Sequence, residues 1–307
     1  MKLFTSLINT IKEHFRLKLI ICFILCAILP LLILGTISYK ISYNIAKDKI
    51  LKETAISCEK NQHLLENRMT QIENLEDSIH FNLCMLCTTA EQPMSNYLDK
   101  LSAVRNNIAS TADSFNIYHV NIFLPDDSFA SKEGLTFCSL SDLKKYKVQL
   151  SDFSKQGLTP NWIFRKDINF PYMVSKGEEP SGVLSCYRYA KINSQKTCLA
   201  VHITSEELSN YLNTFSEGNP SLSYIINSEG VVLSSTDKKQ IGGSLSNEKL
   251  HAITQNLRLS HFSYDKCEII STPVHNQLFL VTETPDYYIR QSSSFLVKMI
   301  FICFMII

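Results

Sequence analysis

The feature that most constrains this sequence is an uncharged apolar run near its N-terminus. The 19 residues from Leu19 to Ile37 carry no charged side chain, and a helix needs about 20 such residues to cross the hydrocarbon core of a bilayer. Polar residues up to Lys40 follow the run, without the small-residue cleavage site of a signal peptide. The sequence therefore predicts a transmembrane helix over residues 19–38, after a cytoplasmic N-terminus of residues 1–18.

A second apolar run covers residues 295–307 and carries one charged residue, Lys298. It is too short to span a bilayer and ends while still apolar, so we expect it to be the start of a second transmembrane helix. Residues 39–294, between the two runs, form a segment long enough to be translocated whatever its charge. This segment is predicted to be extracytoplasmic, in a protein of the cell membrane.

Composition excludes several functional classes. The chain has 30 Lys and Arg residues against 29 Asp and Glu, a net charge of +1, so no nucleic-acid partner is predicted. Walker, G-x-S-x-G and H-E-x-x-H motifs are absent from the sequence, and neither catalytic residues nor a cofactor are predicted. Three classes stay open: a ligand-sensing signal transducer, a structural or adhesive envelope protein, and an ectoenzyme.

Periodicity predicts an α+β chain. Residues 39 to about 110 form a long helix rising from the membrane and a shorter one after Pro93, since apolar residues recur every three or four positions. These apolar positions are Leu65, Met69, Ile72, Leu75, Ile79, Leu83 and Leu86. Strand-like runs follow in two sets, separated by a helix from Ser205. The runs are Phe115–Leu124, Thr136–Leu140, Trp162–Phe164, Gly182–Tyr189 and Thr197–Ile203, then Ser223–Ile226, Val231–Ser234, Cys267–Val274 and Leu278–Thr282, with a helix around Asn247–Gln255. We expect two tandem antiparallel-sheet modules, over residues 39–204 and 205–290.

The most specific signal lies between Ser223 and Leu245, in the sequence SYIINSEGVVLSSTDKKQIGGSL. Asn227 and Gly230 occupy the first and fourth positions of a predicted tight turn between two apolar strands, and Ile241-Gly242 follows. This pattern resembles the Cache (extracellular PAS-like) repeat. With GVLSCYRYA, CLAVHITSEELSNYL and the NWIF segment, residues 15–307 resemble the outer region of a double-Cache, YesM-like sensor histidine kinase of Gram-positive bacteria.

This resemblance implies a homodimer that senses a small-molecule solute outside the cell and signals through a cytoplasmic response regulator. The phospho-accepting His and the ATP site would lie beyond residue 307, so no enzymatic activity is expected of this chain. Chemoreceptors and membrane diguanylate cyclases use the same modules and are alternatives. The resemblance also implies that the solute binds in the membrane-distal module, about residues 57–204, while the proximal module relays.

Four residues of that module are candidate ligand contacts: Trp162, Arg165, Tyr187 and Tyr189. The two tyrosines are two apart on a predicted strand and so project from one face. Trp162 would add a second aromatic wall, and Arg165 would meet an anion or hydroxyl groups. The competing interpretation is that these aromatic residues are core. No amino-acid-binding signature is recognisable, which favours sugars, peptides or other solutes.

Cysteines offer two further candidates. Cys186 and Cys198 flank a predicted hairpin centred near Ile192, which would place them opposite each other as a disulfide or as two buried thiols. His80, Cys84 and Cys87 share one helical face, but a structural zinc site needs four ligands and no fourth is evident. We therefore interpret Cys84 and Cys87 as core residues and predict no metal site.

Overall fold

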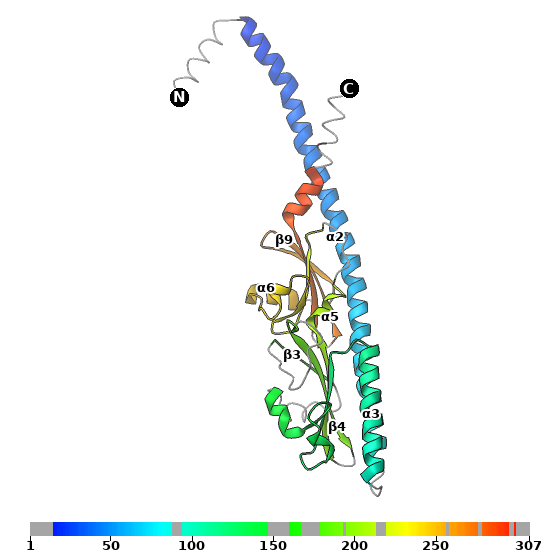
Figure 1. The fold of residues 1–307 in the computed structure, drawn as a ribbon. Coiled ribbons are helices and arrows are strands. Elements are labelled where there is room, and N and C mark those ends of the chain that lie inside the picture. The colour runs from blue at the N-terminus through cyan, green and yellow to red at the C-terminus, as the bar shows by residue number, and fades with distance from the viewer. Residues whose placement is uncertain are drawn as a thin grey trace. The chain divides into compact units, whose positions relative to one another are not determined.

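The computed structural model describes residues 15–87, 94–146, 160–166, 179–192, 195–212, 219–255, 258–275, 278–294 and 298. The chain divides into two compact units. One unit comprises Met1–Glu53 with Pro285–Ile307, and the other comprises Thr54–Thr284. Helices and strands carry the labels shown in Figure 1.

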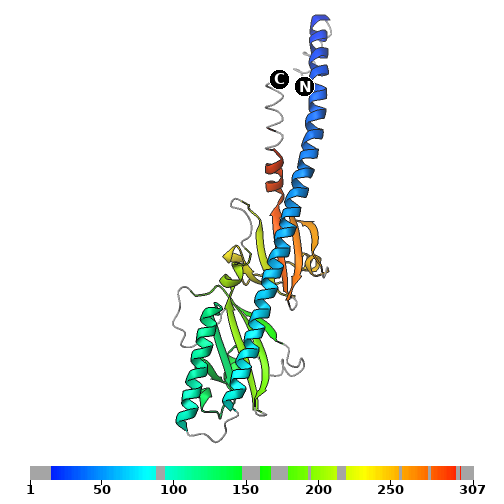
Figure 2. The same cartoon turned by 90° about the vertical axis from the view of Figure 1, so that its right-hand side faces the viewer.

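Two helices form the N-terminal part of the described chain. Helix α2 is a 73-residue helix, Phe15–Cys87, with Pro30 inside it, and α3 is Met94–Ser114. Figures 1 and 2 show α3 beside the last turns of α2. The predicted apolar stripe is confirmed where side chains are described. Its members Leu65, Met69, Ile72, Leu75, Ile79 and Leu83 are each at most 7% exposed.

The predicted transmembrane segment, residues 19–38, lies inside α2 and is helical. Across the described ranges, however, no helix has the combination of length and apolar character that crossing a membrane requires. The second predicted segment, residues 295–307, lies outside the described residues except for Lys298.

The first sheet has the strand order β2-β1-β5-β4-β3. Its strands are β1 (His119–Leu124), β2 (Phe137–Ser139), β3 (Asn161–Arg165), β4 (Val183–Ile192) and β5 (Gln195–Thr204). The 3-10 helices η1 (Ala130–Lys132) and η2 (Leu140–Tyr146) flank β2. All pairings are antiparallel except β1 with β2.

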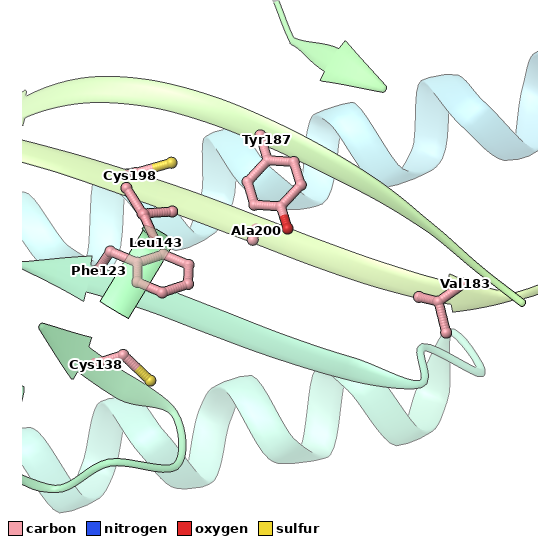
Figure 3. Packing of buried hydrophobic residues seen from close by; sticks show 7 residues of the cluster. All are labelled: Phe123, Cys138, Leu143, Val183, Tyr187, Cys198 and Ala200. Atoms are coloured by element: carbon pink, nitrogen blue, oxygen red, sulfur yellow. The ribbon is translucent and has the colours of Figure 1, made fainter. Parts of the chain in front are cut away.

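The two faces of the first sheet pack against different parts of the chain. Arg188 on β4 bonds Glu76 of α2. The side chains that point to the same side of the sheet as Arg188 therefore form the face that packs on α2, named here the helix face. The opposite face, the cluster face, carries an apolar core cluster shown in Figure 3. Its buried members are Phe123, Cys138, Leu143, Val183, Tyr187, Cys198 and Ala200.

The second sheet has the order β7-β6-β10-β9-β8. The short helix α5 (Ser205–Ser209) leads out of the first sheet. The other elements are β6 (Leu222–Ile226), β7 (Val232–Ser235), η3 (Lys238–Gln240), α6 (Asn247–Thr254), β8 (Ser260–Tyr264), β9 (Cys267–Val274) and β10 (Leu278–Pro285). Two five-stranded sheets with a long N-terminal helix confirm the predicted α+β class. Strand β8 was not predicted.

The turn between β6 and β7 confirms the interpretation of its sequence. Asn227 Oδ1 accepts hydrogen bonds from the main-chain N–H of Glu229 (3.1 Å) and of Val231 (2.8 Å). Gly230 has a φ of +81°, which glycine adopts without the steric cost that a side chain brings. Its N–H donates to Asn227 O at 3.0 Å.

The expectation that Cys186 and Cys198 lie opposite each other is wrong, and of the two alternatives for them the pair of buried thiols stands. Ile192 pairs with Gln195, so Cys186 lies opposite Val201 and Cys198 lies opposite Tyr189. The partner of Cys186 is therefore three positions further along the chain than predicted. Because side chains alternate along a strand, an odd shift turns the two cysteines to opposite faces. Both are buried free thiols.

Candidate functional site

Three of the four candidate contacts lie on the cluster face. Tyr187 and Tyr189 project from β4 on this face, and Tyr187 belongs to the buried cluster, with Tyr189 packed against it. Arg165 on the neighbouring strand β3 lies opposite Val183, another member of the cluster, so alternation places it on the same face. Tyr187 is 1% exposed, whereas Tyr189 and Arg165 are half-buried.

Trp162 does not share that face. It lies opposite Cys186 on β4, and its indole Nε1 donates to Glu73 Oε1 of α2 at 3.1 Å. The expectation that Trp162 adds a second aromatic wall beside the two tyrosines is therefore wrong, because its position in the alternation turns it to the helix face. Ligand binding by Arg165, Tyr187 and Tyr189 stays a prediction.

A chain of buried polar side chains crosses three strands of the cluster face. Ser185 Oγ lies 2.7 Å from His202 Nδ1, and His202 Nε2 lies 3.0 Å from Asn121 Oδ1. Asn121 Nδ2 lies 2.8 Å from Leu135 O and 3.1 Å from His119 Nε2. An amide oxygen only accepts hydrogen bonds, so His202 carries its hydrogen on Nε2 and accepts the Ser185 hydroxyl at Nδ1. The chain links β4, β5 and β1.

Burial keeps both imidazoles of this chain neutral. Desolvation lowers the pKa of His202 well below its usual value, and the nearby His119 lowers it further. The pKa of His119 is also lowered by burial, which outweighs the opposing effects of the Leu135 carbonyl and Glu133. The rings of His119 and His202 stack at 6.2 Å, and Tyr187 meets His202 edge-on at 6.0 Å. The network therefore fixes Tyr187 with uncharged groups.

A serine hydroxyl bonded to an imidazole nitrogen is also how serine nucleophiles are activated. Ser185 and His202 are both 0% exposed, so in this structure no substrate carbonyl can reach the hydroxyl. This network was not predicted from the sequence. Finding it needs the pairing of His119 with His202 across β1 and β5, which no local pattern encodes.

Across the ranges that the structure describes, no group of three or more His, Cys, Asp or Glu side chains could hold a metal ion. His80 Nε2 lies 3.9 Å from Cys84 Sγ on α2. The side chain of Cys87 is outside the described part of the chain.

Helix α5 connects the first sheet to both α2 and the second sheet. Ser205 Oγ donates to Leu233 O at 2.5 Å, and Ser234 Oγ donates back to Ser205 O at 2.6 Å. Two residues further on, Glu207 Oε1 lies 3.2 Å from Arg68 Nη2 of α2, and both side chains are largely buried. Strand β5, which carries His202, therefore leads directly into α5. We call α5 and its contacts with the second sheet and with α2 the junction at α5.

In the other unit, α2 contacts a short helix over residues 286–294. Tyr43 Oη donates to Asp286 Oδ1 at 2.7 Å, and Arg290 Nε donates to Asp286 Oδ2 at 2.7 Å. The bond from Tyr43, with those from Arg290, lowers the pKa of Asp286. Ser42 and Ala46 of α2 are buried, as are Ile289 and Ser293 of the short helix.

No family model matches the sequence, and no curated protein matches it. Solved structures do match. The periplasmic sensory domain of the Campylobacter jejuni chemoreceptor Tlp1 has a TM-score of 0.58 at 14% identity, over 78% of this chain and 98% of that one. The extracellular domain of vpHK1S-Z8, a protein assigned as a histidine kinase, has a TM-score of 0.56 at 13% identity, over 80% and 98%.

The sensory domain of the Campylobacter jejuni chemoreceptor Tlp3, solved with isoleucine bound, has a TM-score of 0.51 at 16% identity, over 82% of this chain and 98% of that one. At these identities the likeness concerns the fold. The chain therefore has the fold shared by these sensory domains of chemoreceptors and histidine kinases.

Proposed function

We propose that this chain is the extracytoplasmic ligand-sensing region of a membrane-bound, two-component sensor histidine kinase, and that a small solute binds on the cluster face of its first sheet. The observation that carries the proposal is that Arg165, Tyr187 and Tyr189 project from neighbouring strands β3 and β4 on the face turned away from α2. The likeness to sensory domains supports it.

The chemistry of the cluster face suits a small solute that combines an apolar body with a polar or anionic end. The ring of Tyr189 offers flat apolar contact, and Tyr187, which is 1% exposed, supports that ring from within the core. Burial raises the pKa of Tyr189, which keeps its hydroxyl as a hydrogen-bond donor. The guanidinium of Arg165 matches a carboxylate, a phosphate or a pair of hydroxyls. The buried network of Ser185 and His202 is uncharged. Of these residues, Arg165 therefore determines which charge on the solute the site favours. Sugars, peptides and amino acids are the classes to screen.

The junction at α5 offers a route for the signal. A solute that moves β4 and β5 by about 1–2 Å, a shift typical of switching proteins, would displace Ser205 and Glu207 at the end of β5. Through their bonds to Leu233 and Arg68 the shift would reach the second sheet and α2. The resemblance implies that a homodimer converts such a shift into kinase activity, which a cytoplasmic response regulator then reads.

Membrane attachment in this proposal rests on the sequence, on the uncharged run of residues 19–37. Protease treatment of intact protoplasts tests the arrangement. Residues 39–294 should be digested, while a tag placed before Lys18 survives. Loss of that tag would invert the proposed topology.

A binding screen tests the site. The full chain, purified in detergent, is examined by thermal shift against amino acids, sugars and short peptides, and each hit is measured by calorimetry. Arg165→Gln and Tyr189→Ala should each weaken binding of a hit by about tenfold or more, equivalent to about 1.4 kcal/mol. Trp162→Phe, on the helix face, is the matched control and should leave the affinity unchanged. Parent-like binding by both cluster-face variants would place the site elsewhere.

A chemoreceptor sensory region is the second candidate, because Tlp1 and Tlp3 share the fold to a similar degree. The two candidates differ in the output domain. Reading the encoding gene past residue 307 distinguishes them, since a histidine phospho-acceptor and ATP-binding domain would support the kinase, and a chemoreceptor signalling domain would support the alternative.

A further inference from the structure

Helix α2 buries a carboxyl group against the helix face of the first sheet. Glu76 is 0% exposed. Its Oε2 accepts from Cys186 Sγ at 3.4 Å and from Arg188 Nε at 3.3 Å, whereas its buried Oε1 has no hydrogen-bond partner among the residues that the structure describes. A buried carboxylate with an unsatisfied oxygen is costly. The site is therefore better suited to the neutral acid than to the anion.

The charges around Glu76 do not remove that cost. On its own helix, Glu73 and Asp77 are further acids. On β4, Arg188 is shared, since its Nη1 bonds Asp77, a side chain that is 62% exposed. Hydrated Asp77 therefore competes with Glu76 for one guanidinium.

Among the described residues, the other strands at this contact add no cation that bonds Glu76. Cys198 on β5 lies on the cluster face, and burial and Glu76 raise the pKa of its thiol. Trp162 on β3 is a neutral donor to Glu73 Oε1, and His275, which follows β9, donates to the same oxygen at 2.8 Å. These two donors serve Glu73, one helical turn before Glu76.

Burial dominates the titration of Glu76. Desolvation raises its pKa to about 8, an effect that Arg188 and Cys186 oppose and that Glu73 reinforces. The carboxyl is therefore protonated at neutral pH and ionises in mildly alkaline solution.

We propose that Glu76 is a proton-operated latch between α2 and the first sheet: the neutral carboxyl lets helix and sheet pack closely, and its ionisation loosens that contact. The ionised Glu76 carboxylate would attract water or Arg188 to Oε1. Either change would alter the packing of α2 against β4. Because Glu73 also bonds His275, a change here reaches the second sheet. The latch makes this region responsive to external pH and needs no solute, so it stands apart from the proposed ligand sensing.

The only tryptophan in the chain reports on this contact. Trp162 is bonded to Glu73, so its fluorescence is followed from pH 6 to 9.5 in the full chain. The parent should show a transition centred near pH 8, and Glu76→Gln should abolish it. Glu59→Gln, at an exposed position of the same helix, is the matched control and should keep it.

A second variant keeps the test decisive if Glu76→Gln does not fold. Arg188 lowers the pKa of Glu76, so Arg188→Gln should move the transition to higher pH, and an unchanged midpoint would overturn the latch. A transition that survives in Glu76→Gln but disappears in His275→Asn belongs to His275 and also overturns it. Solute binding, measured separately by calorimetry, can succeed or fail without changing either result.

Discussion

The hydroxyl of Tyr43 donates a 2.7 Å hydrogen bond to the carboxylate of Asp286, 243 residues further along the chain. The bond joins the helix that leads into the two sheets to the helix that follows them. Asp286 also accepts from Arg290, so one carboxylate ties both helices together. In a region that transmits a signal, the Tyr43–Asp286 bond would couple the movements of the two helices.

Tyr43→Phe should loosen the helix over residues 286–294. The variant loses one hydrogen bond to an ionised group in a partly exposed position, which is worth about 1 kcal/mol. Amide hydrogen exchange in residues 286–294 should therefore be faster than in the parent. Tyr287→Phe, at a residue that is 60% exposed, is the control and should leave exchange unchanged. Equal exchange in Tyr43→Phe and the parent would mean that the bond does not hold this helix.

Glu76→Gln should change how stability depends on pH. The folded-state pKa of Glu76 is about 8 against an ordinary value of 4.5. The stability that this raised pKa provides is therefore complete below about pH 4.5 and declines as the pH rises to 8, by about 1.4 kcal/mol per pH unit. Glutamine does not titrate. Chemical denaturation at pH 5 and pH 8 should show the parent losing several kcal/mol relative to the variant, and parallel curves would contradict the buried acid.

His202→Ala should destabilise the first sheet by about 2–4 kcal/mol, because it leaves the buried Ser185 hydroxyl and the Asn121 amide oxygen without their shared partner. His63→Ala, at a side chain that is 76% exposed, should cost less than about 0.5 kcal/mol. Urea denaturation measures both. A cost for His202→Ala no larger than that of the control would show that the network contributes nothing.

The same variant should remove part of the acid sensitivity of the protein. The pKa of His202 is depressed below its usual 6.5, so the folded state binds fewer protons than the unfolded state. Its contribution to stability is present above pH 6.5 and is lost as the pH falls toward the folded-state pKa. Stability between pH 7 and pH 5 should therefore fall less steeply in His202→Ala than in the parent.

Arg68→Met should cost about 3–5 kcal/mol, since it leaves the largely buried Glu207 without its charged partner. Arg105→Met breaks a looser pair, in which Arg105 is 50% exposed and lies 3.7 Å from Glu133. That control should cost less than about 1 kcal/mol. Denaturant midpoints compare the two variants directly. Similar costs would show that the junction at α5 is no tighter than a surface contact.

Patterns that lie within one element could be predicted from the sequence. The helical stripe from Leu65 to Leu83 is buried as expected, and the Asn227–Gly230 turn forms as expected, because both depend on neighbours within a few residues. Strand β8 was not predicted because its sequence, SHFSY, mixes serines with aromatic residues. β8 is an edge strand, which pairs with a neighbouring strand on one side only.

Features that depend on register could not be predicted. The position of one hairpin turn decided which way Cys198 points and separated it from Cys186. The face of Trp162 depended on its pairing with β4. The bond between His202 and Asn121 joins residues 81 apart, and the burial of Glu76 requires the sheet that covers it. In each case the deciding contact comes from a distant strand.

The reciprocal bonds of Ser205 also set a rule for recombining such regions by protein engineering. One of the two bonds ends on the main-chain carbonyl of Leu233, an acceptor that any donor sequence supplies. The other needs a hydroxyl at the position of Ser234. At α5, a chimaera spliced after Leu212 therefore needs only a serine or threonine from the foreign second sheet. The bonds that Gln62 and Glu73 of α2 make to Thr272 and His275 would have to be rebuilt with that sheet.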